Sequence, residues 1–197
     1  MINKSNISKA GFTLMETLVA VLVLSLAITG PLAIAQKGLQ AALISKDQIS
    51  AFYLAQDAIE YIRYARDTNC LAAGSSAGGC PVGQWLVGNN NATQSINLVA
   101  CVGTVGTNAC TTDSIAASAP IACVSGICAP IKYDASHNYY TYGSGSASIF
   151  TRAVTITTPV CNGSTCNASE AQVSVKVTWS DPIPHTVTVK EDILDWQ

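Results

Sequence analysis

Hydrophobic residues are concentrated near the amino terminus, where a long apolar segment follows a short polar one. Residues 1–11 are polar and include Lys4 and Lys9, whereas residues 12–35 carry no charge except Glu16. As an α-helix, residues 12–35 would be about 36 Å long, which exceeds the hydrocarbon core of a bilayer. Lysines before an apolar segment favour keeping that end in the cytoplasm. We therefore predict a single membrane-spanning helix, with the amino terminus cytoplasmic and the carboxy-terminal part exported.

A helical repeat of apolar residues continues beyond the spanning segment. Apolar side chains recur at the spacing of one helix face at Phe52, Ala55, Ile59 and Ile62. Charged and polar residues occupy the remaining positions, as in an amphipathic helix that packs on a domain. The repeat ends at residues 67–69, where Asp, Thr and Asn follow one another. We predict one helix from Phe12 to about Arg66, lipid-facing in its first half and packed on a domain in its second.

The last third of the chain alternates between apolar and polar residues, which is the pattern of half-buried strands. The clearest alternation is in Val173, Val175, Val177 and Trp179. Further strands are predicted at residues 149–158 and 185–190, with a turn at 180–184 and a short strand at 95–102. Three antiparallel strands with one apolar face need a partner, and the helix stripe provides one. The predicted fold class is therefore α+β, a long helix packed on a small antiparallel sheet.

All eight cysteines lie after residue 69, in the part predicted to be exported. An even number of cysteines in such a segment is typical of disulfides formed in an oxidising compartment. Zinc is the rival interpretation, but the spacings are longer than the usual C-x2-C, so we predict no metal. Cysteine number alone leaves the connectivity open. We predict four local pairs that staple loops: Cys70–Cys80, Cys101–Cys110, Cys123–Cys128 and Cys161–Cys166.

Glu16 is an unusual residue for a spanning helix, because an unpaired carboxylate there costs about 2 kcal/mol or more. Cleavage of the chain between Gly11 and Phe12 would create a positively charged α-amino group four residues before Glu16. That amine could pair with Glu16 of the same chain or of a neighbouring subunit. The alternative is an ordinary secretory signal peptide, which would be removed after Ala35.

Residues 9–20, KAGFTLMETLVA, resemble the class III leader and N-terminal segment of type IV pilins and type II secretion pseudopilins. Within this family, the sequence of the segment most resembles the minor pilin V and minor pseudopilin I branch. The resemblance implies a pilin-like fold, cleavage after Gly11 by the membrane-embedded prepilin peptidase, and N-methylation of Phe12. It also implies that Glu16 acts in subunit recruitment and register.

The resemblance further implies a division of the chain and a set of partners. Residues 1–11 would be a leader that is removed, 12–35 a transmembrane and filament-core helix half, 36–69 an amphipathic half, and 70–197 an exported β domain. Partners would be other pilin or pseudopilin subunits, the prepilin peptidase/methyltransferase, the inner-membrane assembly platform, and membrane lipid before assembly. The protein would then reach a pilus or pseudopilus at the cell surface.

Gly30 and Pro31 interrupt the otherwise regular helix pattern. Proline removes one backbone hydrogen bond and clashes with the preceding turn. In related filaments the stretch around a Gly-Pro pair can lose helicity, which is what the resemblance implies here. A simple fixed kink is the alternative.

Charge and composition exclude several other function classes. The net charge is −2, and the chain lacks the clustered Lys and Arg of nucleic-acid-binding proteins. His137 and His185 lie in segments that we predict to be loops or turns, without a neighbouring nucleophile, so we predict no enzymatic activity and no cofactor. Four tyrosines form a cluster that could bind a partner or fill a half-buried loop: Tyr133, Tyr139, Tyr140 and Tyr142.

These observations predict a structural role. The expected protein is a minor pilin or pseudopilin subunit that joins a type IV pilus or a type II secretion pseudopilus. The alternative is an exported monomeric binding protein or adhesin that ordinary signal peptidase releases after Ala35.

Overall fold

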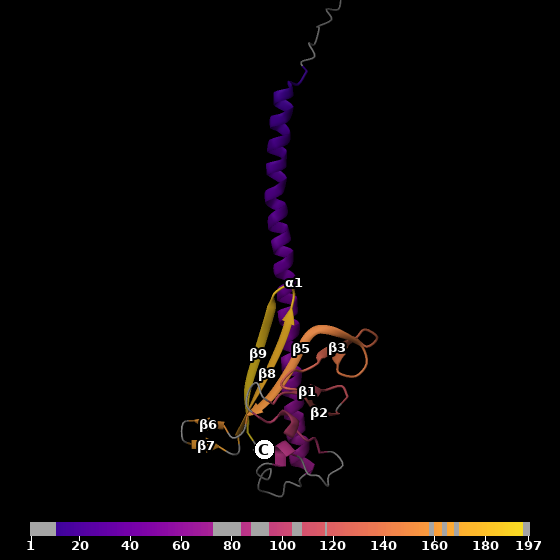
Figure 1. The fold of residues 1–197 in the computed structure, drawn as a ribbon, viewed down its shortest axis with the longest axis vertical. Helices are drawn as coiled ribbons and strands as arrows, with labels where there is room; N and C mark the ends of the chain where they lie inside the picture. The colour runs from indigo at the N-terminus through magenta and orange to yellow at the C-terminus, as the bar shows by residue number, and fades with distance from the viewer. Residues whose placement is uncertain are drawn as a thin grey trace, which may run out of the picture. The chain divides into compact units, whose positions relative to one another are not determined.

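The computed structural model describes residues 11–72, 84–87, 95–103, 108–116, 118–157, 160–162, 165–167 and 170–194 (Figure 1). The chain divides into two compact units, Met1–Lys46 and Asp47–Gln197.

The first unit consists, in its described part, of the amino-terminal portion of one helix. The helix α1 extends over Leu14–Ala72 and contains Gly30 and Pro31 without interruption. The Thr13 hydroxyl accepts a hydrogen bond from the Glu16 amide at 3.3 Å, as a helix N-cap residue does. Residues 11–43 are all exposed, and this part of α1 is long and apolar enough to cross a membrane.

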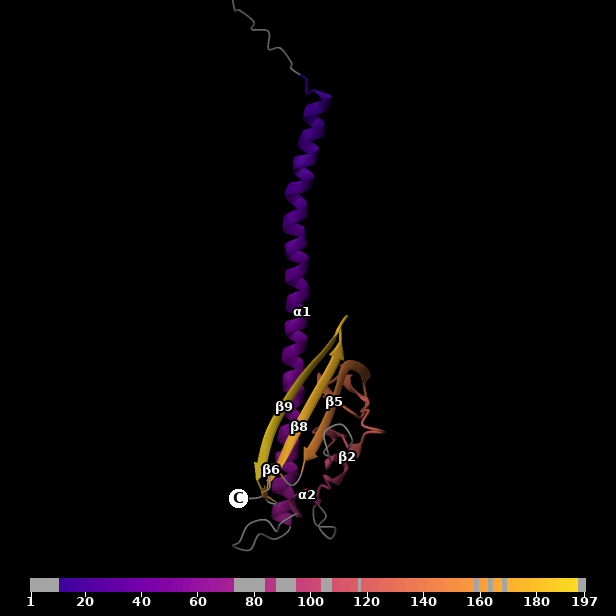
Figure 2. The ribbon, with the colours of Figure 1, turned by 60° about the vertical axis from the view of Figure 1, so that its left-hand side comes forward.

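The second unit contains a seven-stranded antiparallel sheet among the described residues (Figure 1). The long strand β5 is central, because it pairs with β1 and β3 on one side and with β8 on the other. The strand β8 pairs in turn with β9, and Figure 2 shows β5, β8 and β9 side by side. The bounds are β1 Cys110–Asp113, β2 Ser118–Ala122, β3 Pro130–Asp134, β4 Tyr139–Thr141, β5 Ser146–Thr157, β8 Glu170–Ser180 and β9 Pro184–Leu194.

Three shorter elements complete the described structure. They are the helical turn α2 at Gln84–Val87, the 3-10 helix η1 at Val99–Cys101, and a separate hairpin of β6 at Val160–Asn162 and β7 at Thr165–Asn167. The strand predicted at 95–102 is therefore wrong. There the Asn97 side chain accepts a hydrogen bond from the Val99 amide at 2.8 Å, which stabilises a turn instead of an extended chain.

The core of the second unit lies between α1 and the sheet, as the α+β prediction requires. All four residues of the predicted alternation, Val173, Val175, Val177 and Trp179, are buried in β8. The predicted strands at 149–158 and 185–190 correspond to β5 and β9. On α1, the buried stripe consists mainly of alanines and isoleucines, which allow the helix to approach the sheet closely. Phe52, predicted to belong to this stripe, is 44% exposed and lies beside it.

The helix ends at Ala72, six residues later than predicted. The later end arises because the Asn69 side chain forms buried hydrogen bonds within the fold and does not end the helix. Asn69 is fully buried, and its amide nitrogen donates to the carbonyls of Trp85 at 2.9 Å and Ile96 at 2.8 Å. Its side-chain oxygen accepts from the Ile96 amide at 2.7 Å. One polar side chain thus satisfies three buried backbone groups and joins α1 to α2 and to the segment before η1.

Replacing Asn69 with leucine is expected to destabilise the second unit by about 3 kcal/mol, because three buried backbone groups lose their partners. The measurement is the free energy of unfolding by urea of the detergent-solubilised chain, followed by tryptophan fluorescence. The matched control is Asn97→Ala, which removes one exposed hydrogen bond and should cost under about 1 kcal/mol. Equal stability of the two variants would contradict the role assigned to Asn69.

Disulfides stabilise the part of the chain that has little regular structure. Cys101 is bonded to Cys110, and Cys123 to Cys128, and both are among the four pairs predicted from spacing. Cys70 is also disulfide-bonded, while its predicted partner Cys80 lies outside the described residues. The backbone register of β6 and β7 places residue 161 opposite residue 166. That placement brings the backbones of the fourth predicted pair, Cys161 and Cys166, next to each other.

Candidate functional site

The amino-terminal part of α1 exposes a long and mostly apolar surface. Phe12, the residue after the predicted cleavage point at Gly11, is 80% exposed, and large aliphatic side chains follow along the helix. Contiguous apolar surfaces of this size mark contacts with lipid or protein, because water does not solvate them favourably. Glu16, in the first turn, is the one charged residue among residues 11–36. The predicted cleavage, methylation and register residues therefore lie together at one helix end.

Polar side chains within this apolar part bond to the helix itself. The hydroxyl of Thr17 donates to the Leu14 carbonyl at 2.9 Å, and that of Ser25 to the Val21 carbonyl at 2.8 Å. Thr29 donates in the same way to Leu26 at 3.2 Å. Because each hydroxyl is hydrogen-bonded within its own helix, it would not be left as an unpaired polar group when the helix lies in lipid.

Gly30 and Pro31 lie in the middle of this surface. Pro31 has no N–H to offer the carbonyl of Ala27, so one backbone hydrogen bond of α1 is missing there. The helix nevertheless continues on both sides. Helicity is therefore kept at Gly30 and Pro31 in this structure. The fixed kink, and the loss of helicity that the resemblance implies for a filament, stay predictions.

In the second unit, a buried arginine ties α1 to the sheet. Arg152 on β5 is 1% exposed, and its guanidinium donates to the Leu54 carbonyl at 2.8 Å and to the Asp57 carboxylate at 2.6 Å. It also donates to the Thr112 carbonyl at the end of β1. Arg152 therefore joins its own strand β5 to α1 and to β1, and the sequence pattern of β5 did not predict its burial.

The isolated aspartates also have structural roles. Asp113 accepts hydrogen bonds from the Thr141 hydroxyl at 2.7 Å and the Tyr142 amide at 2.8 Å. Burial by itself would raise the pKa of Asp113, but these bonds, with those from the amides of Ile115 and Ala116, bring it below its ordinary value. Asp113 thus stabilises the fold in its ionised form, and this contribution is lost as the pH falls through its lowered pKa.

Both histidines contact a neighbouring side chain of the fold. His137 is mostly exposed and lies 3.0 Å from Asp134, whose pKa it lowers through this contact. His185, at the boundary between the predicted turn and the strand predicted at 185–190, lies in β9 and stacks on Trp179 at 5.2 Å between ring centroids, because the β8–β9 register pairs the two residues. Within the described ranges, no group of three His, Cys, Asp or Glu residues could hold a metal ion.

The predicted tyrosine cluster forms a hairpin surface and part of the core, not a loop. Tyr133 on β3 contacts Tyr140 on β4 at 5.2 Å between ring centroids, and Tyr140 contacts Phe150 at 6.1 Å. The Tyr142 hydroxyl donates to the Arg152 carbonyl at 3.3 Å. Tyr139 and Tyr140 also line a depression beside α1.

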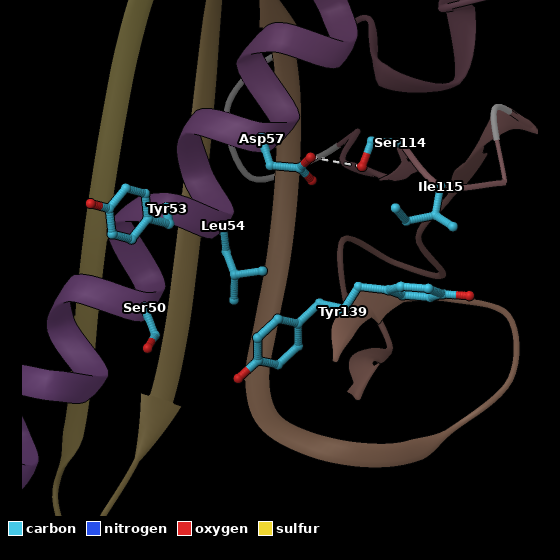
Figure 3. A pocket seen from close by; sticks show the side chains of 8 residues that line it. Ser50, Tyr53, Leu54, Asp57, Ser114, Ile115 and Tyr139 are labelled. Carbon is cyan, nitrogen blue, oxygen red and sulfur yellow. Dashed lines mark hydrogen bonds between the residues drawn. The ribbon is translucent and has the colours of Figure 1, made fainter. Parts of the chain in front are cut away.

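Two adjoining depressions flank α1 on the side of the turn between β1 and β2. They measure about 330 Å³ and about 350 Å³ and share Asp57 and Ser114. Figure 3 shows Asp57 on the helix reaching across to Ser114, whose hydroxyl donates to it at 2.7 Å. Acidic and tyrosine side chains of α1 line both depressions. Sequence reasoning missed this groove, although the helical spacing of these residues could have indicated it.

Two surfaces of the described parts of the chain stand out as able to contact other molecules. One is the apolar helix surface with Glu16, and the other is the groove beside α1. No protein-family model, curated protein or solved structure matches the chain.

Proposed function

We propose that the protein is a structural subunit, a minor pilin or pseudopilin, of a type IV pilus or type II secretion pseudopilus. The observation that carries the proposal is the juxtaposition of Gly11, Phe12 and Glu16 at the start of an exposed apolar helix. A pilin-like arrangement, with an exported domain on the second half of the helix, is part of the proposal. The long helix and the antiparallel sheet support it.

The Glu16 carboxylate would form an ion pair with the amino group that cleavage creates at Phe12. After cleavage behind Gly11, the new α-amino group of Phe12 has a pKa of about 8 and is mostly protonated at neutral pH. A carboxylate and an ammonium about 4 Å apart attract by roughly 4 kcal/mol at an effective dielectric constant of 20. Apolar contacts between two helices do not by themselves determine how far one is shifted along the other. In a filament, pairing of Glu16 with the Phe12 amine of a neighbouring subunit would fix this axial register. In this proposal the prepilin peptidase and the inner-membrane assembly platform are the partners before assembly.

The apolar half of α1 supports an assembly role over release by signal peptidase. Release after Ala35 would leave residues 36–46 as a helical extension of a unit that has its own core. It would also leave Glu16 without a function, because the carboxylate would be discarded with the leader. Retention of the apolar surface gives the exposed leucines and valines a partner, either lipid or other helices.

The experiment that tests the proposal is the mass of the mature amino terminus. We expect N-methylated Phe12 in material from membranes and from sheared filaments. Replacing Gly11 with tryptophan should abolish cleavage, because a bulky residue at the scissile bond is excluded from the peptidase site, and uncleaved protein should accumulate in membranes. A mature protein that begins at Gln36, or normal processing of the Gly11→Trp variant, would overturn the proposal in favour of a released protein.

A further inference from the structure

Four residues form an exposed stripe along the second half of α1. Tyr53, Asp57, Glu60 and Tyr64 follow one another at intervals of four, three and four residues, so they lie on one helix face. We call them the tyrosine–acid stripe, and it is about 16 Å long. Tyr53 is 65% and Tyr64 is 55% exposed, which is unusual for rings of this size.

The surroundings of the stripe are typical of a protein interface. The stripe lines both depressions described above, and Ile115, across the groove, is also exposed. Tyrosines are enriched at interfaces between proteins and among the residues that contribute most to binding. Asp57 contacts Arg152 and Ser114, and Glu60 contacts Arg63, yet both carboxylates remain partly exposed. The centre of the stripe can therefore accept further cations.

The charge of the second unit indicates what kind of group the stripe attracts. Residues 47–197 contain eleven acidic and six basic residues. Burial raises the pKa of two tyrosines on this side, that of Tyr61 to about 12 with a smaller contribution from Asp113, and that of Tyr140 with smaller contributions from Tyr133 and Asp47. The second unit therefore carries a net negative charge, which favours a cationic partner.

The same unit carries two matching cations. Its arginines and Lys132 contact carboxylates or carbonyls of their own chain. Lys176 on β8 and Lys190 on β9 are exposed and make no hydrogen bond or ion pair within the described residues. The register pairs Lys176 with Thr188 and Lys190 with Ser174, so both lysines lie diagonally on the sheet face away from α1.

We propose that the tyrosine–acid stripe of one copy binds Lys176 and Lys190 of a second copy. Two carboxylates then face two ammonium groups about 7–8 Å apart at the Cβ atoms, and the tyrosine rings cover the aliphatic parts of the lysines. The contact joins different faces of the two copies, which is the geometry of an open assembly and not of a closed dimer. This inference rests on the proposed function and adds to it that copies of this chain adjoin one another.

Two other lysines of the chain fit the stripe less well. Lys37 and Lys46 on α1 are nine residues apart, which is two and a half helical turns. They therefore point to opposite sides of the helix, and a single partner surface can contact only one of them. The pair on the sheet presents both charges to one partner.

The test is disulfide crosslinking between two full-length copies that are expressed together. One copy carries Glu60→Cys and the other Lys190→Cys. Dimers are measured on non-reducing gels, and the joined peptides are identified by mass. We expect at least tenfold more dimer than with the matched control, in which Lys132→Cys replaces Lys190→Cys. Equal dimer yields from both pairs, or a higher yield when Lys37→Cys or Lys46→Cys takes the place of Lys190→Cys, would overturn the inference.

A charge exchange provides a second readout, because both residues are exposed and lie outside the core. Lys190→Glu should reduce the amount of the chain recovered in sheared filaments by at least fivefold, and a further Glu60→Lys substitution should restore it. The mature amino terminus is measured in the same samples. Methylated Phe12 with no effect of the charge exchange refutes the second-copy contact alone. Absence of methylated Phe12, with the specific crosslink still formed in membranes, refutes the proposed function and supports the contact.

Discussion

Replacing Glu16 with leucine is expected to yield a processed, membrane-embedded chain that is missing from filaments. The change removes a desolvated carboxylate, so insertion of the helix should be unaffected or improved. The second unit should fold normally, because its core contains no residue before Ala51. Assembly should fail because the Phe12 amine of the neighbouring subunit loses its partner. The measurement is the ratio of the chain in sheared filaments to the chain in membranes, which we expect to fall at least tenfold.

The matched control for this variant is Thr17→Leu. Thr17 is the next residue along, and its hydroxyl bonds only to the carbonyl of Leu14 in its own helix. Its replacement changes the volume and polarity of the same turn without removing a charge. Normal incorporation of the Glu16→Leu variant would show that the carboxylate does not determine register, and equal loss in both variants would show that the effect is steric.

Replacing Arg152 with methionine is expected to destabilise the second unit by about 3 kcal/mol. The guanidinium is buried and hydrogen-bonds the carbonyls of Leu54 and Thr112, which would lose a donor in the interior. Asp57 would lose its partner as well, but it is partly exposed, so water compensates part of that loss. The measurement is urea unfolding of the detergent-solubilised chain, followed by the fluorescence of the buried Trp85 and Trp179.

Two further variants identify the origin of this effect. Arg152→Lys keeps the charge but cannot reach three acceptors with one planar group, so an intermediate loss is expected. Lys132→Met removes one exposed hydrogen bond to the Gly143 carbonyl and should change the free energy of unfolding by less than about 1 kcal/mol. A loss below about 1 kcal/mol for Arg152→Met would contradict the structural role of this arginine.

Much of the architecture follows from local patterns in the sequence. The uncharged run of residues 17–36 predicts a helix able to span a membrane, because its length and composition alone determine that property. The alternation around Val175 predicts β8, because a strand half buried on one face repeats every two residues. The disulfides Cys101–Cys110 and Cys123–Cys128 join residues close in sequence, so spacing was sufficient to suggest them. The motif at Gly11, Phe12 and Glu16 likewise depends only on neighbouring residues.

The tertiary structure decided the features whose partners are distant in the sequence. The strands β1 to β4 are short and lack a regular alternation, and β1 and β3 pair with β5 through residues up to 44 positions away. Asn and Arg side chains are usually found at the surface. Asn69 and Arg152 are buried because each donates hydrogen bonds to buried carbonyls of other elements. The groove beside α1 exists only because the turn at Ser114 returns to the helix. In each case the free energy comes from a contact between segments that the order of residues does not bring together, so only the folded chain reveals it.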